Sequence, residues 1–154
     1  MNPPDQQRIT LNTEAREFLD AHVVGHLATA DSTGAPHVIP VCFARVDDRL
    51  YFVADEKAKR HGPLRLKRLA NIRENPRAAL VVDDYNEDWQ RLAFLLLHLE
   101  AALVTDWDEY QVALSALRAR YPAYRSMALA PESHPMVRLT TVSHHLWRAA
   151  RARV

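Results

Sequence analysis

Hydrophobic residues follow a helical period near the start of the chain. They recur at helical spacing at Ala15, Phe18, Leu19 and Val23. Asn12 and Thr13 precede this run, and both residue types cap helix N-termini well. Glu14 would lie near the positive end of the helix dipole, where a carboxylate is favourable. The pattern predicts a first helix that begins at Asn12 or Thr13.

The pattern then changes to that of strands separated by short turns. Residues 25–30 and 36–46 have the composition of buried strands, and the residues between them, Asp31 to Gly34, form a typical turn sequence. Asp47 and Asp48 lead into a further strand over 49–54. Strands joined by such tight connections pair antiparallel, so these three strands are predicted to form a meander.

Two more helices are indicated in the second half of the chain. The first is short, ends near Asn75 and Pro76, and has an apolar face formed by Leu66, Leu69, Ala70 and Ile72. Asp106 caps the second helix. Its apolar positions recur at helical spacing at Tyr110, Ala113, Leu114, Leu117 and Tyr121.

Three further strands complete the pattern. Residues 77–84 indicate a buried strand, and residues 136–142 alternate as the last one. Residues 89–104 resemble a long strand, although their leucines and alanines would also suit a helix. About six strands with few helices, and no regular strand–helix alternation, predict a mainly β (α+β) fold: a six-stranded antiparallel β-barrel with peripheral helices.

Composition places the chain among ordinary globular proteins. It has 154 residues, of which 48% are hydrophobic and 25% charged, and its net charge is +1. This predicts a single domain over residues 1–154, with 1–10 as a loose N-terminal arm. Cys42 is the only cysteine, and no apolar leader or spanning segment is visible, so we expect a cytoplasmic protein that does not insert in a membrane.

Cations gather after the strand over 49–54. Six Lys or Arg residues occur between Lys57 and Arg68. A strand end followed by cations and a helix start suits phosphate, because helix N-termini offer free N–H groups. A solvated basic turn remains the alternative, since charge runs commonly face water. A nucleic-acid partner is not expected, because the chain is nearly neutral and the cluster contains no aromatic residues.

No recognisable nucleophile, nucleotide loop or metal motif is present. Among the eight histidines, His144 and His145 are adjacent and would point to opposite faces of a strand, and Cys42 has no partner thiol, so no metal site is expected. The three glycines, Gly25, Gly34 and Gly62, do not form a dinucleotide-binding or phosphate-binding loop. Any chemistry would then come from a cofactor with its own reactivity.

Several stretches resemble one family in order and spacing. They read FLDAHVVGHLATADSTGAPHVIPVCFA, then LYFVADEKAKRHGPLRLKRLANIRENPRAALVVDDYNEDWQRL, then RYPAYR and HLWRA, and they cover nearly the whole chain. The sequence is similar to the pyridoxamine phosphate oxidase-like split β-barrel family, also called FMN-binding split barrels. Within it, the chain resembles the branch of deazaflavin (coenzyme F-420)-dependent oxidoreductases.

The resemblance implies a homodimer with cofactor sites in the grooves between protomers. The strand around Val38, Pro40, Val41 and Cys42 would lie along the flavin or deazaflavin ring and hydrogen-bond its polar edge. The resemblance places the phosphate at the strand end and basic turn formed by Phe52, Val53, Lys57, Lys59 and Arg60. The segment DDYNEDW, which includes Trp89, would fold over the site, and Trp147 with Arg148 would reach the partner's cofactor. For both Trp89 and Trp147, packing at a dimer interface is the alternative.

The function that the resemblance implies is hydride transfer between the bound ring and a small planar unsaturated substrate. Arg65, Lys67 and Arg68 would suit the acidic tail of coenzyme F-420, which favours this cofactor over FMN. No catalytic side chain is assigned. The alternative is a non-catalytic module that carries or senses haem or flavin. Relatives tend to have aromatic residues, an Arg and a Gly where this chain reads AFLLLHLEA. If this strand lines the site, the substrate pocket is more apolar or the cofactor is held more weakly.

Overall fold

The computed structural model describes residues 9–55 and 66–150. The helices are α1 (Thr13–Ala21), α2 (Lys67–Glu74) and α3 (Trp107–Arg120), with short 3₁₀ helices η2 (Trp89–Arg91) and η3 (Pro122–Arg125). The strands are β1 (Gly25–Ala30), β2 (Pro36–Val41), β3 (Ala44–Val46), β4 (Arg49–Val53), β5 (Arg77–Asp84), β6 (Ala93–Leu103) and β7 (Met136–Arg148).

The sheet closes on itself because its two end strands are halves of one stretch of chain. The strands pair antiparallel in the order β2-β1-β5-β6-β7-β4-β3. β2 and β3 lie at opposite ends of this order, yet only Cys42 and Phe43 separate them in the chain. The sheet therefore curls until its ends meet at these two residues. The predicted antiparallel barrel is confirmed, but its strand count of six is wrong, because the predicted strand 36–46 breaks at this point and gives a 7-stranded sheet.

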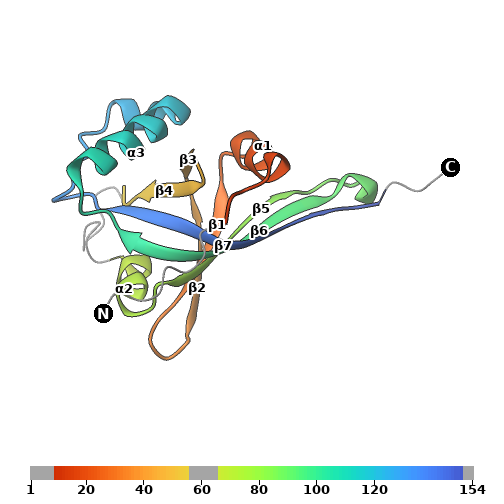
Figure 1. The fold of residues 1–154 in the computed structure, drawn as a ribbon, viewed down its shortest axis with the longest axis horizontal. Helices are drawn as coiled ribbons and strands as arrows, with labels where there is room; N and C mark the ends of the chain where they lie inside the picture. Colours follow the sequence, from red (N-terminus) through yellow and green to blue (C-terminus); the bar gives the residue numbers. More distant parts are fainter. Residues whose placement is uncertain (1–8, 56–65, 151–154) are drawn as a thin grey trace.

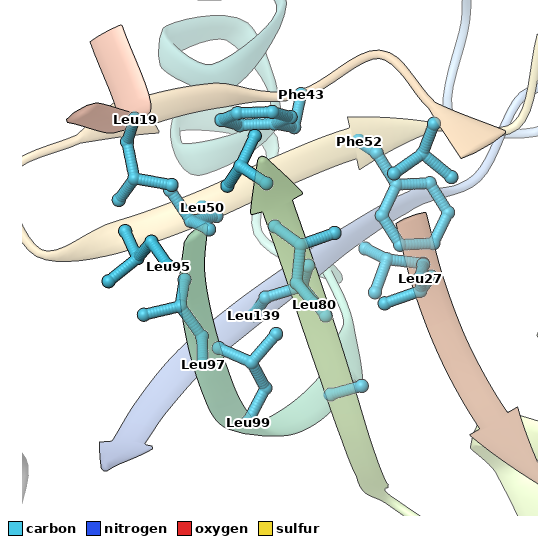
Figure 2. Packing of buried hydrophobic residues seen from close by; sticks show 14 of the residues in the cluster. Leu19, Leu27, Phe43, Leu50, Phe52, Leu80, Leu95, Leu97, Leu99 and Leu139 are labelled. Atoms are coloured by element: carbon cyan, nitrogen blue, oxygen red, sulfur yellow. The ribbon is translucent and has the colours of Figure 1, made fainter. Parts of the chain in front are cut away.

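Leucines from every side of the barrel fill its interior (Figure 2). β6 alternates strictly, so that Leu95, Leu97 and Leu99 point inward and are nearly or fully buried. Burying one such side chain contributes roughly 1.5–3 kcal/mol. Gly25 on β1 fits this packing, because a Cβ there would lie 2.8 Å from Cδ1 of Leu80. The apolar stretch AFLLLHLEA is thus mainly barrel core.

A bulge in β7 explains why its predicted end at residue 142 is wrong. His98 of β6 pairs with Ser143 and Leu99 pairs with Thr141, so Val142 has no partner in the ladder. One extra residue in a strand exchanges the faces on which odd and even positions lie. Thr141 faces the core before the bulge, and Leu146 packs against the core after it. The alternation breaks at Val142, but the strand continues to Arg148.

The predicted helices are present, with corrections at their edges. Asn12 caps α1 by accepting a hydrogen bond from the N–H of Ala15, but Val23 lies beyond the helix and is 56% exposed. Asp106 caps α3 as predicted. In α2 the predicted core residue Ala70 is exposed, because Arg68 and Asn71 lie on the buried face together with Leu69 and Ile72.

Two elements give the molecule its outline. α3 and η3 cover the barrel on the side of β3 and β4, where a second apolar cluster forms. β5, β6 and β7 run on past the barrel as a long twisted arm, which ends at η2 and the end of β7 (Figure 1). α2 lies at the opposite end of the molecule from the tip of this arm (Figure 1).

Candidate functional site

The break between β2 and β3 is held by a tyrosine from the other half of the chain. The hydroxyl of Tyr121 accepts a hydrogen bond from the N–H of Phe43 at 2.9 Å. The same oxygen lies 2.7 Å from the carbonyl oxygens of Phe43 and of Val23, and its single proton serves one of them at a time. The hydroxyl thus replaces partners that the backbone loses where the strand ends.

A second tyrosine, Tyr124 in η3, reaches the end of β4. Tyr124 is nearly buried and donates a hydrogen bond of 2.6 Å to the carboxylate of Asp55. Its ring meets that of Tyr121 edge-on, with centroids 5.6 Å apart. Burial raises the pKa of Tyr121, and burial together with the Asp55 carboxylate raises that of Tyr124 further. Both phenols therefore stay protonated and act as hydrogen-bond donors at physiological pH.

These contacts surround a cavity between the end of β2 and the end of β4. Its volume is about 130 Å³. The lining residues are Pro40, Val41, Cys42, Phe52, Val53, Asp55, Arg68 and Tyr124. Pockets that enclose a whole ligand of drug size typically measure roughly 300–1,000 Å³, so this cavity can form only part of a site for a tricyclic ring.

Five residues predicted from the sequence to contact a cofactor meet at this cavity. They are Pro40, Val41, Cys42, Phe52 and Val53. Phe52 and Val53 are 1% and 3% exposed, because their side chains belong to the two apolar clusters. They would therefore offer a ligand mainly backbone atoms. Val38 lies on β2 as well, but its side chain is 62% exposed and does not line the cavity.

One edge of β2 has backbone groups available for a ligand. β2 is an end strand of the sheet and pairs only with β1. Pro36 and Pro40 cannot donate to a ladder, and alternate residues of a strand direct their backbone groups to the same side. That side is therefore the unpaired edge of β2. It includes the N–H and carbonyl of Val38 and the carbonyl of Pro40, a mixed set of donor and acceptors.

The cavity also contains polar residues that the sequence did not assign to a cofactor. Asp55 and Tyr124 were missed, and Arg68 was expected to extend toward an acidic tail, yet it is 8% exposed and lines the cavity. The sequence signal that could have indicated Tyr124 is the stretch RYPAYR, in which Tyr121 and Tyr124 lie on either side of Pro122. Burial raises the pKa of the Cys42 thiol, which keeps it in the neutral form.

The remaining predicted site residues lie elsewhere or outside the described residues. Trp89 is 71% exposed in η2, and Trp147 stacks on Phe94 with centroids 5.5 Å apart. Both belong to the outer part of the arm, far from α2 and its Arg68 (Figure 1). In the single chain DDYNEDW does not reach this cavity, and its folding over a site shared with a second chain stays a prediction. Lys57, Lys59, Arg60 and Arg65 fall outside the described ranges.

Other features of the described residues give no competing centre. Lys67 is exposed and lies 3.5 Å from the carboxylate of Asp31. A larger cavity of about 250 Å³ holds none of the predicted site residues, and is lined by Ile9, Val46, Asp47, Asp48, Arg49, Tyr51, Thr140 and Thr141. Across residues 9–55 and 66–150, no three His, Cys, Asp or Glu side chains are grouped so that they could hold a metal ion. Within the same ranges no helix has the length and apolar character needed to cross a membrane.

Known structures share this fold at low sequence identity. A conserved hypothetical protein of Mycobacterium tuberculosis matches with a TM-score of 0.71 and 18% identity over 94% of this chain and 90% of that one. A FAD-binding protein of Mesorhizobium loti matches with a TM-score of 0.63 and 22% identity, over 88% and 92%. The haem storage protein HutZ of Vibrio cholerae matches with a TM-score of 0.66 and 16% identity, over 91% and 95%.

Comparison of the sequence with family models identifies the family. No curated protein matches the chain. The family model described as pyridoxamine 5'-phosphate oxidase, however, matches residues 11–145, which include every described strand from β1 to β6 and most of β7. Together with the curled antiparallel sheet and its covering helices, this match shows that the chain belongs to the pyridoxamine 5'-phosphate oxidase-like split β-barrel family.

Proposed function

We propose that the protein is an oxidoreductase that binds a deazaflavin (coenzyme F-420) or FMN and transfers hydride to or from a small planar unsaturated substrate. One observation carries the proposal: five residues expected from the sequence to contact the cofactor line a single cavity. They come from the end of β2 with the following Cys42 and from β4, two strands that are not neighbours in the sheet order. Family membership and a flavin-binding structural neighbour support the same ligand class.

The residues present fit the polar edge of such a ring. A flavin or deazaflavin ring has alternating carbonyl and N–H groups, and it supplies the hydride chemistry when bound. The open edge of β2 offers the N–H of Val38 and the carbonyls of Val38 and Pro40. These groups are held by the sheet, so the protein would orient the ring without reorganising. The phosphate would bind at Lys57, Lys59 and Arg60, with Arg65 available to the acidic tail of F-420.

A homodimer would supply the missing part of the site. The outer face of the sheet carries the apolar side chains of Val38, Val81, Leu96 and Trp147, of which Val81 and Leu96 lie directly opposite each other. Val38 and Trp147 are 62% and 40% exposed in the single chain. Covering this face with a second copy would bury apolar surface. The arm, which cannot cover the cavity of its own chain, would then place Trp89 and Trp147 near the partner's site.

Titration of the purified protein with each cofactor tests the proposal. F-420 and FMN are added separately, and binding is followed by fluorescence quenching and by calorimetry. We expect saturable binding of one of them at one site per chain, with F-420 preferred. The matched variant Val38→Pro removes one N–H from the open edge of β2 without adding charge, and it should weaken binding. If the folded protein binds neither cofactor, the proposal is wrong.

A second function has a specific observation in its favour. His98 and His145 are exposed on the outer face of the sheet, beside Phe94 and Leu96. Exposed histidines next to apolar side chains suit haem, and the neighbours include HutZ and a haem-binding protein of Mycobacterium smegmatis. The alternative is therefore a non-catalytic haem or flavin module. Addition of hemin distinguishes the two: a sharp Soret band that His98→Ala or His145→Ala abolishes supports haem binding, and no change in the hemin spectrum contradicts it.

A further inference from the structure

Two residues that line the cavity are joined by a hydrogen bond between η3 and the end of β4. Tyr124 donates to Asp55 at 2.6 Å, and both residues line the cavity. Tyr124 comes from η3 and Asp55 follows β4, 69 positions apart in the chain. The bond therefore fixes the position of a carboxylate at the surface that a ligand would meet.

Asp55 is the acidic residue of the cavity wall, and Arg68 is its basic residue. The wall formed by the described residues is thus close to neutral, and an anionic ligand group gains no net attraction from it. The affinity of the cavity for an anionic ligand group depends on where the Asp55 carboxylate lies, because repulsion between like charges rises steeply at short range in a partly buried site. A free carboxylate that turned toward the ligand would oppose binding of a phosphate.

We propose that Tyr124 is a positioning residue: it holds the carboxylate of Asp55 in the cavity wall and thereby sets how strongly the cavity repels the anionic group of its ligand. The inference rests on the proposed function, because the ligand is the phosphate-bearing cofactor proposed above. It adds a residue that selects for charge without touching the reacting atoms.

The tyrosine is well placed for this role. Its ring packs edge-on against Tyr121, and Arg118 donates a hydrogen bond of 3.1 Å to its backbone carbonyl. Tyr124 is 4% exposed, so the residues packed around its side chain leave it little room to change orientation. Since burial keeps the phenol protonated, the hydroxyl remains a donor to Asp55 across the physiological pH range.

The experiment compares two ligands that differ only in the phosphate group. FMN and riboflavin share the ring, but riboflavin lacks the phosphate. In Tyr124→Phe, which removes only the hydroxyl, we expect the Kd of FMN to rise about three- to tenfold while that of riboflavin changes less than about twofold. Tyr51→Phe is the matched control, because the Tyr51 hydroxyl also donates to a carboxylate, that of Glu109, but Tyr51 does not line this cavity, and it should leave both constants unchanged. If the protein binds F-420 and not FMN, F-420 and its phosphate-free chromophore take their places.

A double-mutant cycle shows whether Tyr124 acts through Asp55. Asp55→Asn removes the charge and should tighten FMN binding, again with riboflavin unchanged. In the Asp55→Asn background, Tyr124→Phe should alter FMN affinity by less than about twofold, since no carboxylate remains to position. A merely structural role of Tyr124 would instead weaken both ligands equally and would persist in that background.

The outcomes separate the inference from the proposed function. If wild-type protein binds neither ligand pair, the proposed function fails and this inference falls with it. If it binds them but Tyr124→Phe affects both members equally or neither, only the inference is overturned. Should Tyr124→Phe not fold, Asp55→Asn decides alone: unchanged FMN affinity overturns the inference, and a selective gain for FMN supports it.

Discussion

The hydroxyl of Tyr121 lies 2.9 Å from the backbone nitrogen of Phe43 and 2.7 Å from its carbonyl oxygen. A single side chain thus binds both polar groups of the residue at which the barrel strand breaks. Arg120, the preceding residue, lies over the Phe43 ring with its guanidinium carbon 4.8 Å from the centroid. The break between β2 and β3 is therefore a fixed feature of the barrel. It brings the end of β2 to the cavity wall.

Replacing Tyr121 by Phe should destabilise the protein by about 1–3 kcal/mol, because it leaves the buried N–H of Phe43 without its acceptor. Urea unfolding followed by far-UV circular dichroism measures the change. Tyr85→Phe, on the exposed arm, is the control and should have no effect. A loss of less than about 0.5 kcal/mol would show that water replaces the hydroxyl at the break.

Side chains of β6 alternate between the barrel interior and the outer face, so replacing two neighbouring leucines should lower stability by very different amounts. Leu97 is fully buried in the barrel, whereas Leu96 lies on the outer face and is only partly buried. Leu97→Ala should cost about 2–5 kcal/mol through lost burial and a residual cavity, and Leu96→Ala less than about 1 kcal/mol in the monomer. Thermal unfolding at low protein concentration measures both. Equal losses would contradict the register of β6 with β5 and β7.

Glu109 should make stability depend on pH below the neutral range. Burial works to raise the pKa of its carboxyl, but hydrogen bonds from Arg138 and Tyr51 outweigh it, so the pKa is lowered. A lowered pKa in the folded state contributes stability that is present above the ordinary glutamate pKa, about 4.3, and is lost as the pH falls through the lowered value.

Glu109→Gln should therefore destabilise the protein by about 1–2 kcal/mol at pH 7. The difference from wild type should shrink as the pH falls below about 4, where the wild-type carboxyl becomes protonated as well. Urea unfolding at a series of pH values measures the difference. Glu132→Gln, which has no resolved hydrogen bond in the described part of the chain, is the control. A difference that stays constant down to pH 3 would contradict the ion pair.

The sequence predicted most elements, and its errors have identifiable physical causes. The expected helix and strand faces were drawn from apolar residues only, so Ala70 was placed on the buried face of α2. The buried position is instead occupied by Asn71, which donates a hydrogen bond to Thr29. The break at Cys42 and Phe43 is invisible to the pattern, because the tyrosine that stabilises it is 78 positions away. The bulge at Val142 likewise depends on pairing with β6.

The candidate site was predicted in part for the same reason. Residues on strands, such as Pro40 and Phe52, follow from the family pattern and meet at the cavity. Asp55 and Tyr124 become neighbours only through the packing of η3 against the barrel, which no local pattern encodes. The side chains of Trp89 and Trp147 depend on a second chain, so their place in a site stays a prediction.

Cys42 offers a chemical probe of the cavity. Since burial raises the pKa of its thiol, iodoacetamide should label the folded protein at least about tenfold more slowly at pH 7.5 than the urea-unfolded protein. The labelling rate should rise with pH through a midpoint above about 8.5, the ordinary thiol value. Bound cofactor should slow labelling further, because Cys42 lines the cavity. Mass spectrometry of the only cysteine gives the rate. Labelling unaffected by saturating cofactor would place the ligand elsewhere.

The outer face of the sheet should hold the dimer together. Leu96 lies at the middle of this face, beside Val81 on β5 and His145 on β7. A carboxylate at this position would be desolvated in a dimer, at a cost of several kcal/mol, but would remain hydrated in a monomer. Leu96→Asp should therefore give a folded monomer in analytical ultracentrifugation. Val112→Asp, on α3 and 54% exposed in the single chain, is the matched control and should remain dimeric. Because the cavity of one chain is too small for the ring, the monomer should also lose cofactor binding. Retained binding by a monomeric Leu96→Asp would show that one chain suffices.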